Sequence, residues 1–345
     1  MTSAHTEAGT PTTPGGDAAL MRAVVHTQYG TVAADVLRCA TVSRPTVAED
    51  DVLVRVNASS VDRGTWHIMA GLPLPIRLAG FGVRQPRHLN PGRCLAGTVT
   101  AIGTAVQAFQ VGDRVFGTAD GAFAEYVTAH PDRLALLPSG LSLTQAATIP
   151  VSGVTALQAV RDHGRVGAGH HVLVVGASGG VGTFAVQIAK AFGARVTGVC
   201  GPTKTDLVLA LGADDVIDHT SADFATGTTR YDVILDIGGN SSLTRLRRAL
   251  VPQGTCVIVG GETDGRLLGG FDRTLRALMV APFVSQQLRT FVASENGADL
   301  QVLGDLVEAG HLRPALDRTF ALSEVAEAVQ HVAGGHARGK TVITI

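Results

Sequence analysis

The pattern of apolar and polar residues divides the chain into two parts. In the first part, short apolar runs are separated by glycine and proline, and Val52, Val54 and Val56 alternate with polar residues as a half-buried strand requires. Segments with helical spacing are rare there. Many short strands joined by glycine corners predict a partly open, all-β domain. The predicted strands are Met21–Thr27, Asp51–Asn57, Cys94–Gly103, Asp113–Gly117 and Gly121–Val127.

From His170 onward, strand-like runs alternate with segments of helical spacing, which is typical of a parallel α/β sheet. The run His171–Val175 is rich in β-branched residues. Apolar residues then recur at helical spacing from Val181 to Phe192, and Gly193 ends that helix. The further strands predicted are Arg195–Cys200, Asp215–Ile217, Tyr231–Asp236, Thr255–Val259 and Leu288–Val292, with helices at Leu243–Leu250 and Asp299–Ala309 and a closing strand at Lys340–Ile345.

A glycine-rich turn joins the first of these strands to the first helix. Glycine allows the sharp turn and lets the backbone approach a pyrophosphate, and the helix N-terminus offers free N–H groups to the phosphates. Strand, glycine turn, helix and strand together predict a dinucleotide site. Ligands of such sheets lie beyond the carboxyl ends of the strands, so glycines after two later strands belong to the same site. The predicted cofactor-binding residues are Gly176, Ser178, Gly179, Gly180, Val181, Gly182, Gly238, Gly260 and Gly261.

The end of the second strand indicates which dinucleotide is bound. An NAD site usually carries an acidic residue there, but the chain has Cys200 to Lys204 with no acid before Asp206. A hydroxyl at Thr203 and a cation at Lys204 suit a ribose 2′-phosphate. The sequence therefore predicts NADPH in preference to NADH. In the alternative interpretation, Lys204 is a solvated lysine at the start of a helix.

Composition limits the possible partners and compartment. The chain has 345 residues, enough for two domains, and a net charge of −1, which argues against nucleic acid or an anionic membrane as the main partner. Its four cysteines are widely spaced, as expected for reduced thiols in the cytoplasm. No apolar run is long enough to span a bilayer. Residues Met1–Ala19 are expected to form a disordered tail and not a signal peptide.

Several segments, taken in order, resemble the medium-chain dehydrogenase/reductase superfamily. They are most similar to its zinc-independent quinone oxidoreductase branch, to which zeta-crystallin belongs. The segments are VNASSVDRGTWHIMAG, CLAGTVTAIG, GDRVFG, GAFAEYV, IPVSGVTAL, VLVVGASGGVG, LGADDVID and GKTVITI. They cover nearly all of the chain from Met21 to Ile345.

The resemblance implies a fold, a domain division and an activity. The fold is α/β: a Rossmann domain, a doubly wound parallel sheet, inserted in a GroES-like β-barrel catalytic domain, with the active-site cleft at their junction. Residues 1–20 would be the tail, 21–150 with 311–345 the catalytic domain, and 151–310 the NADPH-binding domain. The activity implied is NADPH-dependent reduction of a quinone or of an activated C=C or C=O bond in a small molecule, commonly by a homodimer.

The resemblance also addresses catalytic zinc. Zinc-dependent relatives use Cys in the segment matching Ala58–Asp62, Gly-His-Glu where this chain has Gly92-Arg93-Cys94, and another Cys near Val151. Those ligands are absent here, and one cysteine does not make a three-ligand site. We therefore expect no metal ligands, and we expect Cys94 to be a buried core residue.

Three residues are candidates for the chemistry. The resemblance places Thr155 near the nicotinamide, and His67 is predicted to polarise or protonate the substrate with help from Asp62. Asp62 could instead be protonated, pair with Arg63 or His67, point away, or cap a turn, and His67 could be a packing histidine.

Two other functions remain open at this point. The first is a dedicated enoyl or ketone reductase for one biosynthetic intermediate, for which the arginines of the loop Leu72–Pro91 could meet an acidic substrate. The second is a protein that binds NADPH as a redox signal without turnover.

Overall fold

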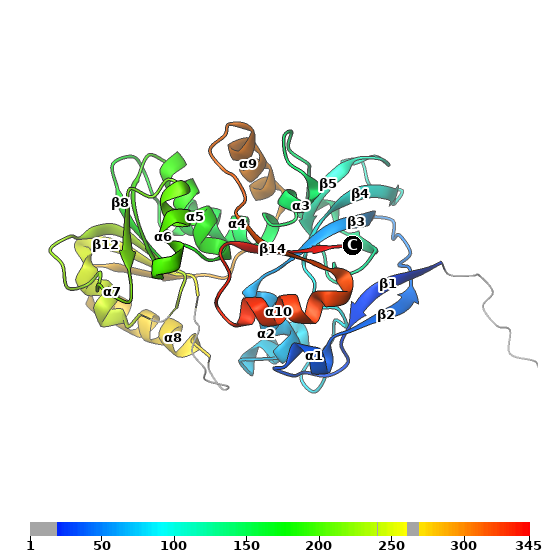
Figure 1. The fold of residues 1–345 in the computed structure, drawn as a ribbon, viewed down its shortest axis with the longest axis horizontal. Helices are drawn as coiled ribbons and strands as arrows, with labels where there is room; N and C mark the ends of the chain where they lie inside the picture. Colours follow the sequence, from blue (N-terminus) through cyan, green and yellow to red (C-terminus); the bar gives the residue numbers. More distant parts are fainter. Residues whose placement is uncertain (1–18, 240, 261–268) are drawn as a thin grey trace, which may run out of the picture.

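The computed structural model describes residues 19–239, 241–260 and 269–345. Figure 1 shows two parts, each built around one large sheet, with helices between and around them. None of the helices within these ranges is long and apolar enough to cross a membrane. The predicted tail of residues 1–20 lies almost entirely outside the described ranges.

One of the two parts is built on a six-stranded parallel sheet, as the alternation of strands and helices from His170 onward predicted. Its spatial order is β10-β9-β8-β11-β12-β13, so the chain runs outward on one side of β8 and then returns to the other side. The strands are β8 His171–Val175, β9 Arg195–Cys200, β10 Asp215–Asp218, β11 Tyr231–Asp236, β12 Leu250–Ile258 and β13 Gln287–Thr290.

Side chains of β8 show why helices cover both faces of this sheet. Val172 and Val174 point into one apolar cluster, whereas Leu173 and Val175 point into another. A strand buried on both faces needs apolar residues on both, as this one has from Val172 to Val175. The sheet is therefore a doubly wound Rossmann sheet, as predicted. The helices of this part are α5 Gly180–Ala191, α6 Thr205–Ala210, α7 Leu243–Ala249 and α8 Phe271–Val280.

The second part contains a seven-stranded sheet whose strands come from both ends of the chain. Its order is β14-β15-β3-β4-β5-β7, and β6 pairs with β3. The C-terminal strand β15 thus lies inside the sheet, antiparallel to β3. The strands are β3 Val52–Val61, β4 Cys94–Ile102, β5 Arg114–Thr118, β6 Tyr126–Ala129, β7 Leu134–Leu136, β14 Leu316–Ala321 and β15 Lys340–Thr344; β1 Leu20–Val25 and β2 Arg38–Ser43 form a separate hairpin-like pair.

Helices connect the two parts. Helix α4 packs against both α5 and α9, and its buried residues belong to the core shared with the cofactor domain. The remaining helices are α1 Ala33–Val36, α2 Arg63–Ala70, α3 Leu143–Ala146, α4 Pro150–Gln158, α9 Gly297–Glu308 and α10 Val325–Ala333. The cores of the two parts are therefore continuous around α4. A site at their junction would be built on well-packed helices and strands.

One predicted strand is placed differently in the structure. The sequence predicts a strand at Gly121–Val127, whereas the strand β6 begins only at Tyr126. Gly121 has φ of +95°, which turns the chain, and Ala124 makes a single isolated bridge to Ala23 of β1. The apolar residues of this segment cross between two sheets instead of extending one of them.

Candidate active site

The glycine turn after β8 has the geometry of a dinucleotide-binding turn. Gly176 has φ of +85°, and Gly179 precedes the first residue of α5 in extended conformation. A Cβ atom on Gly182 would lie 2.1 Å from the backbone oxygen of Gly176, so only glycine lets the helix approach the strand this closely. Ser178 is buried and Val181 packs against the core, which fixes the turn from behind.

The turn lies where the strand order of the sheet reverses. The backbone N–H groups of Ile237 and Gly238 both donate to Val175 O at 3.0 Å, and a Cβ atom on Gly176 would lie 2.9 Å from Gly238 N. A Cβ on Gly260 would lie 2.2 Å from Ile237 O. Gly238 and Gly260 therefore gather at the carboxyl ends of β8, β11 and β12, the usual ligand position in such a sheet. Gly261, also predicted to bind cofactor, lies outside the described residues.

The end of β9 carries the predicted phosphate-binding residues. Thr203 is exposed, and Lys204 is half-buried with its Nζ donating to Ala337 O at 3.0 Å and to Gly335 O at 3.4 Å. Burial lowers the pKa of Lys204. Arg338, which sequence patterns did not single out, lies nearby and bonds both oxygens of Asp206 at 3.0 Å. Two cations thus flank this strand end.

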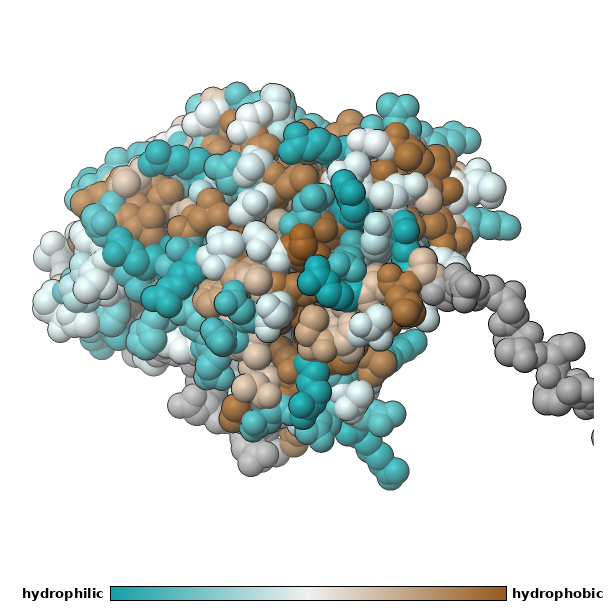
Figure 2. Space-filling view, turned by 45° about the vertical axis from the view of Figure 1, so that its right-hand side comes forward, coloured by the Kyte–Doolittle hydropathy of each residue, from teal (hydrophilic) through white to brown (hydrophobic). Residues whose placement is uncertain are grey.

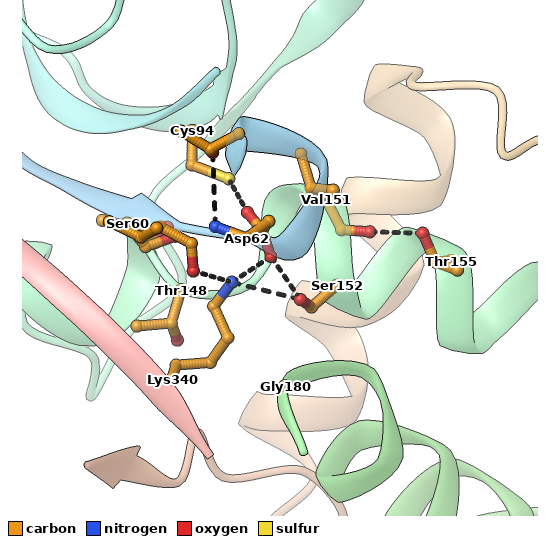
Figure 3. Close-up of polar contacts among 12 residues, drawn as sticks. Ser60, Asp62, Cys94, Thr148, Val151, Ser152, Thr155, Gly180 and Lys340 are labelled. Carbon is orange, nitrogen blue, oxygen red and sulfur yellow. Dashed lines mark hydrogen bonds and ion pairs between the residues drawn. The ribbon is translucent and has the colours of Figure 1, made fainter. Parts of the chain in front are cut away.

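Asp62 stands at the centre of a buried polar cluster on the other side of the turn (Figure 3). It is the residue before α2, where β3 ends. Its Oδ1 accepts hydrogen bonds from Ser152 Oγ at 2.6 Å and from Lys340 Nζ, and its Oδ2 accepts from Cys94 Sγ at 3.2 Å. The Lys340 side chain is only 1% exposed, so this is a buried ion pair.

Of the alternatives considered for Asp62, the capping one agrees with the structure, because Asp62 occupies the N-cap position of α2, whereas pairing with Arg63 or His67 is wrong. Among the residues that the structure describes, its side chain pairs with Lys340 and neither with Arg63 nor with His67. Arg63 instead donates to Ala333 O at 2.6 Å. One sequence signal could have indicated Lys340. It begins an otherwise apolar closing strand, where its charge would be buried and would need a partner.

His67 lies on the last turn of α2 and is held by the loop that follows. Its Nδ1 is 2.8 Å from Leu72 O, and its ring meets Trp66 edge to face. Burial lowers the pKa of His67, which favours the neutral ring. The bond to Leu72 O assigns the proton to Nδ1, so Nε2 is left as an acceptor. In this state His67 can accept a proton but has none to donate from Nε2.

Thr155 lies on α4, one turn after Ser152. Its Oγ1 donates to Val151 O at 2.7 Å, and both Val151 and Thr155 are half-exposed while Ser152 is buried (Figure 3). Because the hydroxyl proton is used within the helix, the oxygen of Thr155 is available to accept a hydrogen bond. An acceptor at this position suits the carboxamide N–H of a nicotinamide.

The three segments matched to zinc ligands do converge, but their donors are poor for zinc. Asp62, Cys94 and Ser152 meet around the ammonium of Lys340. Burial, and then the negative charge of Asp62, raise the pKa of the Cys94 thiol, whereas zinc binds the thiolate. The described part of the chain contains no group of three or more His, Cys, Asp or Glu residues suited to a metal ion. The donor set therefore does not fit a catalytic zinc.

The glycine turn at a switch point, joined to a β-rich partner domain, defines a nicotinamide-dependent oxidoreductase. Comparison with known proteins agrees. Residues 48–139 match the alcohol dehydrogenase GroES-like domain, and residues 211–343 match the family described as zinc-binding dehydrogenase.

Individual relatives extend this match over most of the chain. The mitochondrial NAD(P)H oxidoreductase RTN4IP1 of Mus musculus is 33% identical over 336 residues, covering 86% of this chain and 82% of the relative. The chloroplastic quinone-oxidoreductase QR1 of Triphysaria versicolor is 30% identical over 339 residues, covering 94% and 98%. The solved structure of the quinone oxidoreductase from Coxiella burnetii superposes with a TM-score of 0.83 at 28% identity, covering 95% of this chain and all of that one. The chain belongs to the medium-chain dehydrogenase/reductase superfamily, in the quinone oxidoreductase branch.

Proposed function

We propose that this oxidoreductase uses NADPH to reduce a quinone or an α,β-unsaturated carbonyl compound, without zinc. The observation that carries the proposal is the cluster of Asp62 and Lys340 beside the dinucleotide turn: the segments matched to the ligands of zinc-dependent relatives hold a lysine ammonium there. The relatives named above as quinone oxidoreductases support the choice of electrophile.

The reduced nicotinamide supplies the hydride, so the protein has to hold the two reactants and manage one proton. The glycine turn and the N-terminus of α5 bind the pyrophosphate. Thr155 accepts from the carboxamide and fixes the ring face. Hydride transfer to the quinone leaves one proton to be added, and that proton comes from water, since the neutral tautomer of His67 accepts at Nε2; His67 then orients the substrate hydroxyl that forms.

Selection of NADPH rests on the cations at the end of β9. No carboxylate lies within Cys200–Lys204 to bind a ribose hydroxyl, whereas Lys204 and Arg338 approach the same position. A 2′-phosphate would form charge-assisted hydrogen bonds with both. Asp206, which now bonds Arg338, is exposed and can release it to the phosphate.

The absence of zinc is tested by metal analysis. We expect purified protein to contain far less than stoichiometric zinc and to keep its activity after dialysis against a chelator. Stoichiometric zinc, lost together with activity, would refute this part of the proposal.

A homodimer is proposed from one apolar surface next to an open sheet edge. Strand β13 ends the six-stranded sheet, and the segment around it exposes Phe283 to 87% and Val292 to 91%. Helix α8 adds exposed Leu275, Leu278 and Met279. An open, apolar edge is normally covered by another chain. Light scattering should give twice the chain mass, and Phe283→Glu should shift it to the monomer.

The compartment is proposed from the cysteines. All four are free, and three of them are buried, as expected in a reducing compartment such as the cytoplasm.

The decisive assay follows the loss of the near-ultraviolet absorbance of NADPH with a panel of ortho- and para-quinones, enones and simple aldehydes, with NADH in parallel. We expect turnover with the quinones or enones and a preference for NADPH. Tight NADPH binding without turnover of any acceptor would refute the enzyme and favour a redox sensor.

A further inference from the structure

We propose that Lys340 is a positioning residue that fixes the dinucleotide turn relative to the catalytic sheet, and thereby sets where the nicotinamide meets its substrate. The proposal rests on the hydride-transfer function given above. It assigns to Lys340 no contact with substrate; Lys340 acts through the turn and through Asp62.

The backbone around Lys340 touches the turn directly. The N–H of Gly339 donates to Ser178 O at 3.0 Å, which joins the lead-in to β15 to the residue between two of the turn glycines. The side chain of Lys340 then runs past Gly180, the first residue of α5: a Cβ atom on Gly180 would lie 3.2 Å from Lys340 Cδ. The start of β15 and the side chain of Lys340 therefore pack against the N-terminus of α5.

The ammonium is anchored on two other elements through three acceptors. It bonds Asp62 at the end of β3, Ser152 Oγ on α4 at 3.1 Å, and Val61 O at 3.5 Å (Figure 3). A lysine ammonium has three hydrogens to donate, and these three acceptors use all of them. The ammonium thus ties β15, β3 and α4 together immediately behind the turn.

Stability alone is a poor reason to bury this pair. The cost of removing two charges from water largely offsets their attraction, so well-packed apolar residues would hold the fold equally well. What the pair does provide is geometric definition, because a buried carboxylate with three donors from three segments tolerates few other arrangements. A displacement of about 1 Å between reacting groups costs roughly 100-fold in rate, so hydride transfer is sensitive to this definition.

Three variants separate positioning from stability. Lys340→Met removes the ammonium but keeps the length of the side chain. The double variant Asp62→Asn with Lys340→Met also removes the carboxylate left without its partner. Arg161→Met is the matched control: Arg161 bonds Asp162 at 2.6 Å and Asp299 of α9 at 2.8 Å, so it also joins two segments, and its contacts within the described residues do not include the turn.

The readouts are thermal stability, NADPH affinity, the fluorescence of bound NADPH, and turnover with 9,10-phenanthrenequinone and NADPH deuterated at the transferred position. For Lys340→Met we expect turnover to fall by about 100-fold with a larger deuterium isotope effect. NADPH affinity should change by less than about threefold, because the phosphate contacts remain. The emission of bound NADPH should approach that of the free cofactor, because the ring is no longer held.

The double variant should recover most of the lost stability and none of the lost turnover, and Arg161→Met should lose stability while keeping turnover and emission. The proposal is overturned if Lys340→Met keeps wild-type turnover and emission per folded molecule, or if the double variant restores both. If the wild-type protein does not reduce the quinone, the proposed substrate class is wrong, and the emission of bound NADPH still decides whether Lys340 positions the ring.

Discussion

Replacing Lys204 with methionine should weaken NADPH binding and leave NADH binding unchanged. Lys204 lies at the end of β9, where the adenosine ribose of a dinucleotide is bound in this fold. Its ammonium donates to the carbonyls of Gly335 and Ala337. These acceptors hold the side chain against the segment between α10 and β15, which also carries Arg338.

The size of the effect follows from what the lysine exchanges on binding. A hydrogen bond to a charged group contributes about 1.5–3 kcal/mol, which corresponds to roughly 10- to 150-fold in affinity. Lys204 is only half-buried, and it gives up bonds to Ala337 and Gly335 to bind the phosphate. Both facts move the expectation to the low end of that range, a loss of about tenfold.

Fluorescence titration with NADPH and NADH at two salt concentrations measures this effect. The matched control is Lys190→Met, which removes the same charge from α5, where Lys190 bonds Asp214 at 2.9 Å away from the end of β9. We expect the control to bind both cofactors as the wild type does. An equal loss of NADPH and NADH affinity in Lys204→Met would refute the 2′-phosphate assignment, since NADH has no such phosphate.

Three further outcomes follow from the geometry. Gly182→Ala places a Cβ 2.1 Å from Gly176 O and should weaken NADPH binding at least about tenfold, measured by the same titration, with little change in fold by circular dichroism. Arg273→Met leaves the buried carboxylate of Asp236 unpaired and should lower the free energy of unfolding in urea by about 3–5 kcal/mol; a change below 1 kcal/mol would contradict it. Burial lowers the pKa of four histidines in the folded protein, His26, His67, His163 and His171. The unfolded chain therefore binds more protons, and the free energy of unfolding should fall as the pH drops below about 6.5. A free energy of unfolding that is constant from pH 7 to pH 5 would exclude this contribution.

The parts of the fold that the sequence predicted are those with a local cause. Strand β8 is apolar from Val172 to Val175 because both faces are buried there, and the glycine spacing after it follows from backbone conformation within a few residues. Strand β14 was missed because it lies at the edge of its sheet and most of its side chains are exposed, so its pattern is that of a loop. Helix α2 was missed because Gly64 and Trp66 weaken its helical pattern.

The candidate site divides in the same way. The positions of Gly176 and Gly182 in the turn, and of Lys204 just after β9, could be predicted because these segments are continuous in the chain; their binding of a cofactor stays a prediction. The partner of Asp62 was not found, because Lys340 is 278 residues away and only the insertion of β15 beside β3 brings the two together. Residue spacing in the sequence gives no information about contacts between strands that lie far apart in the chain.

The inner position of β15 has a consequence for biosynthesis. The parallel sheet from His171 to Thr290 is continuous in sequence and can fold while the ribosome is still working. The seven-stranded sheet cannot, because β3 has to wait for Lys340–Thr344 to leave the exit tunnel before that edge is paired. Until then β3 presents an unpaired strand edge and Asp62 has no counter-ion. The N-terminal portion is therefore made first but completes its sheet last.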